Sequence, residues 1–587
     1  MSIAAIAAIM LFNLVLMVTG ACLLWGIRGW ESWGELLRLL GLAYLTAVCC
    51  FGVVLVNALV IGVPFGWLTL AGLLASLAAG GLVVGRLLDR RLPQLPRIRP
   101  IRRPRHTAPP TWIGTLGVSG LVLYLEATFR AGRIAPLQEW DAIAFWIPKA
   151  EAILTFGGLD ERFFSTLPGP SYSPQVPALV ASTFRFIGHP DPITIHLQFW
   201  FLFVGFMAAV AGLLAPRVRP LFLWPPLLLV ALAPEMVTNV LLVQADKLLD
   251  YFVALGLILI ALWLVDRQPW QLVLAGAFLS GAMLTKREGF LLVACLIAAA
   301  LVASWSHKRE TWPQLLGTAA IAFALTRPWH HWFASRGIAS DDGQEGPALG
   351  YLGFVRHPER IWPSLRLTLE TLFASDVWLL VTPLVIVAVL AAALVGSRLL
   401  ALYAGSFLLF GMLACSWVTA TTESGTLRPI VRLTGGLMLP MAGLLPLLLH
   451  AVWARAGSPP ALDRIQRALP GPPRRAAALG LIAVAALGYP VAVLAGGGPP
   501  FPTRADCSAS ATADGDLELV LGTFDSFTEA VPFAEKVKKM GFIHAEPHAN
   551  GCGQVEVGVP EYPTLAGAED AAGEARRAGL EPSVQRR

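Results

Sequence analysis

The chain has 587 residues, of which 56% are apolar and only 14% are charged, with a mean hydropathy of +0.65. Soluble domains are about a quarter charged, so these values exclude an ordinary soluble enzyme and indicate a polytopic membrane protein. The net charge of +6 is no sign of nucleic-acid binding, because the arginines gather in short loops between apolar runs.

Apolar runs near the ~20 residues needed to cross a bilayer recur from Ser2 to Gly498. The first run lacks a basic leader and a clear cleavage site, so we expect it to be retained as a span. Residues 1–110 are predicted to form a three-helix extension with a basic loop, and residues 111–496 a membrane core. We expect about 14 spans, near residues 2–25, 36–60, 64–86, 111–129, 193–215, 220–234, 248–265, 270–285, 289–305, 313–327, 377–396, 399–417, 433–452 and 476–496.

The loop at residues 86–110 decides the orientation. It holds eight arginines against one acid, Asp89, and the positive-inside rule therefore places it in the cytoplasm. Alternation then puts the loops at 130–190 and 328–376, and the C-terminal tail, on the outer face. The sequence predicts a multi-pass protein of the bacterial cytoplasmic (inner) membrane with a periplasmic tail.

The first outer loop carries Glu139-Trp140-Asp141, followed by Phe145-Trp146. A carboxylate just past an apolar helix is costly unless it lies at a wet surface or does chemistry. The neighbouring rings could stack on a sugar, and they could equally form an interfacial aromatic belt. Asp141 also has a structural alternative, because Asp is a preferred residue for capping the start of a helix.

Further polar groups lie at outer helix ends. Asp246 opens an inward-going span, and Leu284-Thr285-Lys286-Arg287-Glu288-Gly289 separates two apolar runs. Arg327 and Arg432 border later outer loops. Simpler interpretations are a local ion pair between Lys286 and Glu288, and a lipid anchor for Arg287.

The order of these sites resembles the GT-C superfamily of membrane glycosyltransferases, which includes the aminoarabinose transferases of lipid A, the protein O-mannosyltransferases and the arabinosyltransferases. The resemblance covers roughly residues 111–450 and includes the Leu-Thr-Lys motif at residues 284–286. It implies a polyprenyl-phosphate-linked sugar as donor and a glycan, lipid or protein of the cell envelope as acceptor. Two features depart from the family pattern: three spans precede the basic loop, and the first acid stands in Glu-Trp-Asp rather than in a pair of acids.

Glycosyl transfer from a lipid phosphate needs a base for the acceptor hydroxyl and cations for the departing phosphate. We predict Asp141 as the base, with Glu139 second, and Asp246 as the group that orients the acceptor or binds a divalent cation. Whether Mg²⁺ or Mn²⁺ is required stays open. The predicted donor-binding residues are Lys286, Arg287, Glu288, Arg327 and Arg432, and the predicted stacking residues are Trp140, Trp146 and Tyr172. The alternatives are a transporter or flippase of lipid-linked sugar, and a membrane scaffold anchored at the wall.

The tail forms a second domain in this interpretation, with a linker at residues 497–514 and a soluble unit at 515–587. Two strand–helix–Gly repeats predict a small α+β domain of βαββαβ order. The segments Gly522-Thr523-Phe524, Gln554-Val555-Glu556-Val557-Gly558 and Ala578-Gly579-Leu580-Glu581-Pro582 resemble the SPOR family. That resemblance implies binding to peptidoglycan glycan strands. The alternative is a ferredoxin-like accessory domain without a glycan ligand.

Two cysteines, Cys507 and Cys552, fall in the outer tail. That compartment permits disulfides, so we predict that they pair, the alternative being two free thiols. No cysteine spacing resembles a zinc site.

Overall fold

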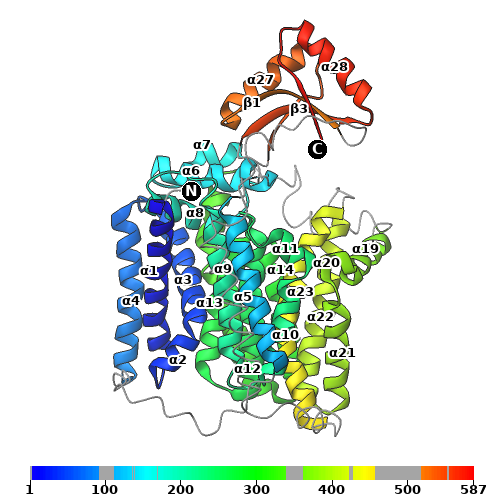
Figure 1. The fold of residues 1–587 in the computed structure, drawn as a ribbon. Coiled ribbons are helices and arrows are strands. Elements are labelled where there is room, and N and C mark those ends of the chain that lie inside the picture. Colours follow the sequence, from blue (N-terminus) through cyan, green and yellow to red (C-terminus); the bar gives the residue numbers. More distant parts are fainter. Residues whose placement is uncertain are drawn as a thin grey trace, which may run out of the picture.

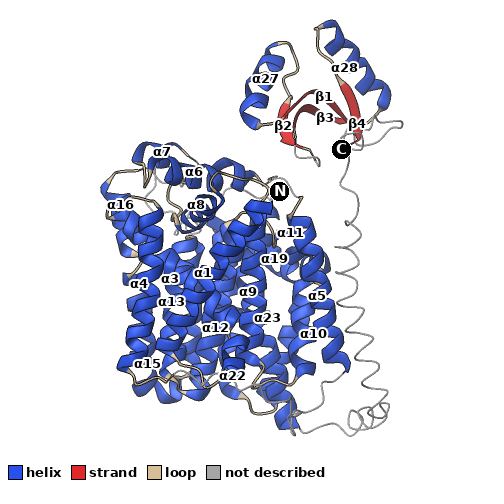
Figure 2. Ribbon diagram, turned by 60° about the vertical axis from the view of Figure 1, so that its left-hand side comes forward, coloured by secondary structure: helices blue, strands red, loops and turns tan. Residues whose placement is uncertain are grey.

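The computed structural model describes residues 3–91, 112–134, 137, 139–167, 169–338, 358, 361–421, 427–456, 517–550 and 554–586. They form a helical membrane domain and a small C-terminal α+β domain (Figures 1 and 2). The expected span at 476–496, the linker at 497–514, and Cys507 and Cys552 lie outside the described residues. The disulfide therefore stays a prediction.

The first helices form a tightly packed layer because small residues let their backbones approach each other. Gly20 of one helix contacts Ala43 of a second, and Gly26 contacts Gly81 of a third. The short second helix starts at Ser32, whose hydroxyl accepts the N–H of Glu35 at 3.2 Å. The bounds are α1 (Ile3–Ile27), α2 (Trp33–Arg38), α3 (Leu40–Val60) and α4 (Trp67–Leu87).

The predicted outer loop at 130–190 is mostly helical. It follows α5 (Trp112–Gly132) and contains a π-helix, η1 (Ala142–Trp146), and the helices α6 (Ile147–Phe156), α7 (Glu161–Thr166) and α8 (Gln175–Ile187). These elements lie at one end of the bundle, and α2 lies at the other (Figure 1).

The centre of the membrane domain is α12, which is buried along nearly its whole length. It packs against α13 and α23. The helices of this part are α9 (His196–Leu214), α10 (Pro220–Ala231), α11 (Pro234–Asn239), α12 (Ala245–Asp266), α13 (Pro269–Thr285), α14 (Glu288–Ala303), η2 (Trp305–His307), α15 (Lys308–Ala324), α16 (Arg327–Ser335), α19 (Ile361–Phe373), α20 (Ser375–Trp378), α21 (Val381–Leu394), α22 (Arg398–Thr421) and α23 (Leu427–Ala456).

Within the described residues, seven helices are long and apolar enough to cross a membrane. Helix α14 and the chain after it would add an eighth if this pair, bent by 72°, is one span. Three further apolar helices, α10, α13 and α21, are shorter. The prediction of a polytopic helical membrane protein is confirmed, whereas the count of about 14 spans stays a prediction.

The C-terminal domain has the element order β1 (Leu517–Phe524), α27 (Phe527–Lys539), β2 (Glu546–Ala549), β3 (Val555–Tyr562), α28 (Leu565–Arg577) and β4 (Ser583–Arg586). Its antiparallel sheet has the strand order β2-β3-β1-β4, and both helices cover one face (Figure 2). Alternate strand residues such as Leu519 and Val557 pack beneath helix alanines such as Ala534 and Ala572. This is the βαββαβ order expected from the sequence, and the SPOR assignment stays a prediction.

Candidate active site

Asp141 lies directly before η1 and faces Arg432, which is 291 positions later in the chain. Its Oδ2 is 2.5 Å from a guanidinium nitrogen of Arg432 on α23, and the two side chains are 16% and 30% exposed. Asp141 has helical backbone angles and makes no side-chain capping hydrogen bond. The helix-cap interpretation is therefore wrong, and an ion pair is what holds this carboxylate.

Asp246 lies in the first turn of α12 and pairs with a lysine from the next helical connection. The Nζ of Lys286 lies 2.8 Å from Asp246 Oδ1 and 3.4 Å from Glu288 Oε1. The side chains of Lys286 and Asp246 are only 8% and 7% exposed. Burial by itself would lower the pKa of Lys286, but the two carboxylates raise it above its ordinary value, so the amine stays charged. The local ion pair between Lys286 and Glu288 is present, as one part of a larger arrangement.

Arg432 joins the two ion pairs into one group. The same guanidinium nitrogen that binds Asp141 also donates to Gln244 Oε1 at 3.3 Å. Gln244 immediately precedes α12, two positions before Asp246. We call Asp141, Asp246, Lys286, Glu288 and Arg432 the polar cluster. It lies at the end of the bundle that carries α6, α7 and α8 (Figure 1).

An aromatic wall borders the polar cluster. Tyr172 stacks on Phe145, with ring centroids 5.8 Å apart and planes 11° apart. The ring of Trp146 lies 5.6 Å from it, centroid to centroid. Two cations also approach the Tyr172 ring: Lys286 Nζ lies 5.9 Å and Arg287 Cζ 5.2 Å from its centroid. Burial raises the pKa of the Tyr172 hydroxyl.

The other two predicted stacking residues differ in burial. Trp146 is 1% exposed and forms part of the core, whereas Trp140 is 66% exposed. Of these two rings, only that of Trp140 is accessible in this arrangement.

A second buried network begins at Lys247, the residue after Asp246 of the polar cluster, and the sequence did not reveal its pairing. Lys247 Nζ lies 2.9 Å from Glu235 Oε1 and 3.2 Å from Asp250 Oδ2. Glu235 also accepts the side-chain amide of Asn239 at 2.7 Å. Burial raises the pKa of Glu235, although Lys247 opposes that shift. The sequence signal was the pair of charges at positions 247 and 250 inside an otherwise apolar helix.

Several buried polar atoms near the polar cluster have no hydrogen-bond partner in the described part of the chain. They include Asp246 Oδ2 and Glu288 Oε2 of the cluster itself, and the hydroxyls of Ser171 and Ser173 on either side of Tyr172. The side-chain amide of Gln175, which lies beside Gly52 of α3, is unpartnered as well. An unsatisfied buried acceptor or donor is costly, so each of these atoms fits a role in binding a polar ligand. No sequence motif marks Ser171, Ser173 or Gln175 as site residues.

Two predicted site residues, Glu139 and Arg327, are not part of the polar cluster. Glu139 lies two positions before Asp141 at the start of the same segment. Arg327 is exposed and lies with its guanidinium 5.5 Å from the ring centroid of Phe323. No hydrogen bond or ion pair within the described residues joins Arg327 to the polar cluster. The structure therefore does not bring Arg327 together with the other predicted donor-binding residues.

The carboxylates of the polar cluster are poorly arranged for a divalent cation. Asp246 and Glu288 share Lys286, and Asp141 faces Arg432, so each is already opposite a positive charge. Among the described residues no group of three or more His, Cys, Asp or Glu side chains could hold a metal ion.

Residues 225–332 match the family model described as dolichyl-phosphate-mannose-protein mannosyltransferase. The match supports the GT-C superfamily. It spans the chain from within α10 to α16 and includes Asp246 and Lys286, while Asp141 and Arg432 lie outside it. No curated protein and no solved structure matches the chain. The match indicates a membrane glycosyltransferase of the GT-C type.

Proposed function

We propose that this protein transfers a sugar from a polyprenyl-phosphate-linked donor to an acceptor of the cell envelope at the outer face of the cytoplasmic membrane. The observation that carries the proposal is the convergence of Asp141, Asp246 and Lys286 around Arg432 at one end of the bundle. These residues come from separate parts of the sequence. Buried charged groups in a membrane bundle are costly, and a charged substrate gives Lys286 and Asp246 a use.

In this proposal the cations hold the donor phosphate. Lys286 supplies a point charge, and Arg432 supplies a planar fork that matches phosphate oxygens. Ion pairs with Asp246 and Glu288 fix Lys286 before substrate binds, so this cation needs little rearrangement as negative charge develops on the leaving phosphate. Arg432 would instead exchange its carboxylate partner, Asp141, for the phosphate.

Asp141 is the proposed base. Its carboxylate is bound to Arg432 in this structure, so a donor phosphate that pairs with the guanidinium competes with it. That competition would release Asp141 to accept the proton of an acceptor hydroxyl as the new glycosidic bond forms. Asp246 Oδ2, buried and without a partner among the described residues, would accept a hydrogen bond from a substrate hydroxyl.

The test is sugar transfer in proteoliposomes from a radiolabelled polyprenyl-phosphate sugar. Asp141→Asn should lower the rate by about 10²–10⁴-fold, the usual contribution of a positioned base. Asp376→Asn changes an exposed acid on α20 and should transfer normally. Equal transfer by Asp141→Asn and the wild type would refute the assignment of the base. If the acceptor is itself a phosphate, no base is needed. Only substitutions of the cations Lys286 and Arg432 should then lower activity.

We further propose that residues 515–587 bind peptidoglycan glycan strands and hold the enzyme near the wall. The domain has its own apolar core between the sheet and its two helices, which supports a separate folding unit. Detergent-solubilised full chain should be retained on purified sacculi, and a chain ending at residue 496 should not. Equal retention of the two chains would refute the proposal.

A further inference from the structure

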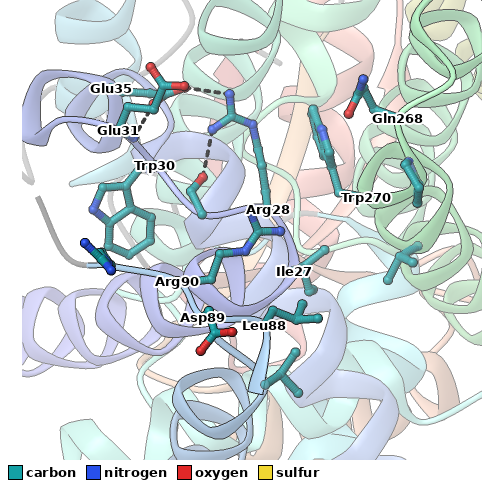
Figure 3. A pocket seen from close by; sticks show the side chains of 15 residues that line it. Ile27, Arg28, Trp30, Glu31, Glu35, Leu88, Asp89, Arg90, Gln268 and Trp270 are labelled. Atoms are coloured by element: carbon teal, nitrogen blue, oxygen red, sulfur yellow. Dashed lines mark hydrogen bonds and ion pairs between the residues drawn. The ribbon is translucent and has the colours of Figure 1, made fainter. Parts of the chain in front are cut away.

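A second polar site lies at the opposite end of the bundle from the polar cluster. There α1, α2, α4 and α13 border a cavity of ≈ 920 Å³, which Figure 3 shows from close by. Arginines and indole rings form much of its wall: Arg28, Arg90, Arg91, Trp30 and Trp270. The positive-inside rule predicts that this end faces the cytoplasm. The site plays no part in the proposed transfer reaction.

The cavity wall has more hydrogen-bond donors than acceptors. The guanidinium of Arg90 makes no hydrogen bond or ion pair within the described residues. The side chain of Arg90 passes over Gly29, where a Cβ would lie 3.2 Å from Arg90 Cδ. Gly29 also has φ = +74°, a conformation that favours glycine, so this residue leaves space for the arginine. The indole N–H of Trp30 is also buried without a partner in the described part of the chain.

Three acids line the cavity: Glu31, Glu35 and Asp89. Glu31 is exposed, and the other two do not supply the missing acceptors. Glu35 already accepts from Arg28 at 2.5 Å and from the N–H of Glu31 at 2.8 Å. Burial by itself would raise the pKa of Glu35, but these two donors lower it overall, so the carboxylate stays ionised and engaged. Asp89 is exposed, and Figure 3 shows its carboxylate turned away from the guanidinium of Arg90. The remaining donors therefore suit an anionic ligand that is rich in oxygen acceptors.

Another part of the wall is apolar and faces outward. Val84, Leu88 and Val273 line the same cavity and are 42%, 56% and 55% exposed. A ligand that fills this space meets cations on one side and hydrocarbon on the other. A soluble phosphate would leave the apolar side uncovered, whereas a phospholipid would satisfy both.

We propose that this cavity binds the phosphodiester headgroup of an anionic phospholipid from the cytoplasmic leaflet. Arg28 lies with its guanidinium carbon 5.1 Å from the ring centroid of Trp270, which holds it at the wall. Arg90 and the N–H of Trp30 are the groups available to the phosphate oxygens. The acyl chains would lie along Val84 and Leu88.

The experiment uses the full chain in nanodiscs of phosphatidylcholine with increasing phosphatidylglycerol, and counts retained lipid by native mass spectrometry. Arg90→Gln should weaken phosphatidylglycerol retention roughly fivefold, because it removes a guanidinium that contacts the bound phosphate. Arg398→Gln, which changes an exposed arginine at the start of α22, is the matched control and should retain lipid like the wild type. Phosphatidylcholine retention should be the same in all three proteins.

Equal phosphatidylglycerol retention by Arg90→Gln and Arg398→Gln would overturn the proposal. So would stabilisation by glycerol phosphate with no preference for phosphatidylglycerol, because the occupant would then be a soluble anion. Trp30→Phe gives a second variant in case Arg90→Gln does not fold. It removes the indole N–H together with part of the ring, and it should also weaken retention. Unchanged retention by that variant would count against the proposed site.

Discussion

The close packing of α23 against α12 at Gly435 predicts that a larger residue at this position destabilises the protein. A Cβ at this position would lie 2.6 Å from Asp250 Oδ2 and 3.1 Å from Lys247 Nζ. Both distances are shorter than an ordinary van der Waals contact. The two charged side chains are 2–3% exposed and bound to each other, so neither can turn toward water. The Gly435→Ala substitution must therefore push the helices apart or separate this ion pair.

The magnitude follows from the competing terms. Overpacking a well-filled interior costs about 1–3 kcal/mol. Separation of a buried ion pair costs about 3–5 kcal/mol, and the better helix propensity of alanine returns roughly 1 kcal/mol. We expect Gly435→Ala to lose about 2 kcal/mol or more of unfolding free energy. Arg432 lies three positions earlier on the same helix, so sugar transfer by the folded fraction should fall as well.

The assay is unfolding of the detergent-solubilised chain by increasing SDS, with transfer measured in parallel. Gly443→Ala is the matched control in the same helix, because its nearest neighbour is the flexible end of Ile258 at 3.2 Å. That variant should stay within about 1 kcal/mol of the wild type. If Gly435→Ala proves as stable and active as Gly443→Ala, the buried network does not set the spacing of these helices.

Three other changes test different parts of the site. Lys286→Gln leaves Asp246 and Glu288 without their shared cation, so SDS unfolding should show a loss of roughly 3–5 kcal/mol, and wild-type stability would contradict the buried pair. Tyr172→Leu should raise the donor KM roughly threefold to tenfold while Tyr172→Phe keeps it, and equal values would deny the ring a binding role. Burial raises the pKa of Glu235 above its ordinary value of 4.5, so stability should fall as the pH rises from there through the folded-state pKa. Glu235→Gln should therefore gain Tm relative to the wild type as the pH rises, and a difference that is constant with pH would contradict that shift.

The fold could be predicted largely from apolar runs, because a bilayer leaves few alternatives to helices of that length. Helices α3, α9 and α12 coincide with runs expected at 36–60, 193–215 and 248–265. The sequence did not reveal the 72° bend after α14, since its geometry depends on packing rather than on composition. Nor did the long loop at 130–190 show its π-helix, which differs from an α-helix by a local change in hydrogen bonding.

The polar residues of the site could be found individually because acids and bases stand out beside long apolar runs. Their pairing could not be found. Asp141 and Arg432 are 291 positions apart, and no spacing rule joins them. Arg327 was included for its charge and its place at a helix end, yet its side chain is exposed and lies beside Phe323. Residue type and position along a helix thus predict candidates, and only tertiary packing selects among them.

The buried network of Glu235, Lys247 and Asp250 is best understood through what it positions. A buried ion pair adds little net stability, because the loss of hydration offsets the attraction between the charges. This network, however, lies where α11, α12 and α23 meet, and Gly435 allows α23 to approach it closely. The same approach sets Arg432 beside Gln244 at the start of α12. We infer that the network fixes the distance between Arg432 on α23 and Asp246 on α12. A substitution in the network should therefore change the geometry of the polar cluster even though none of the cluster's own residues is replaced.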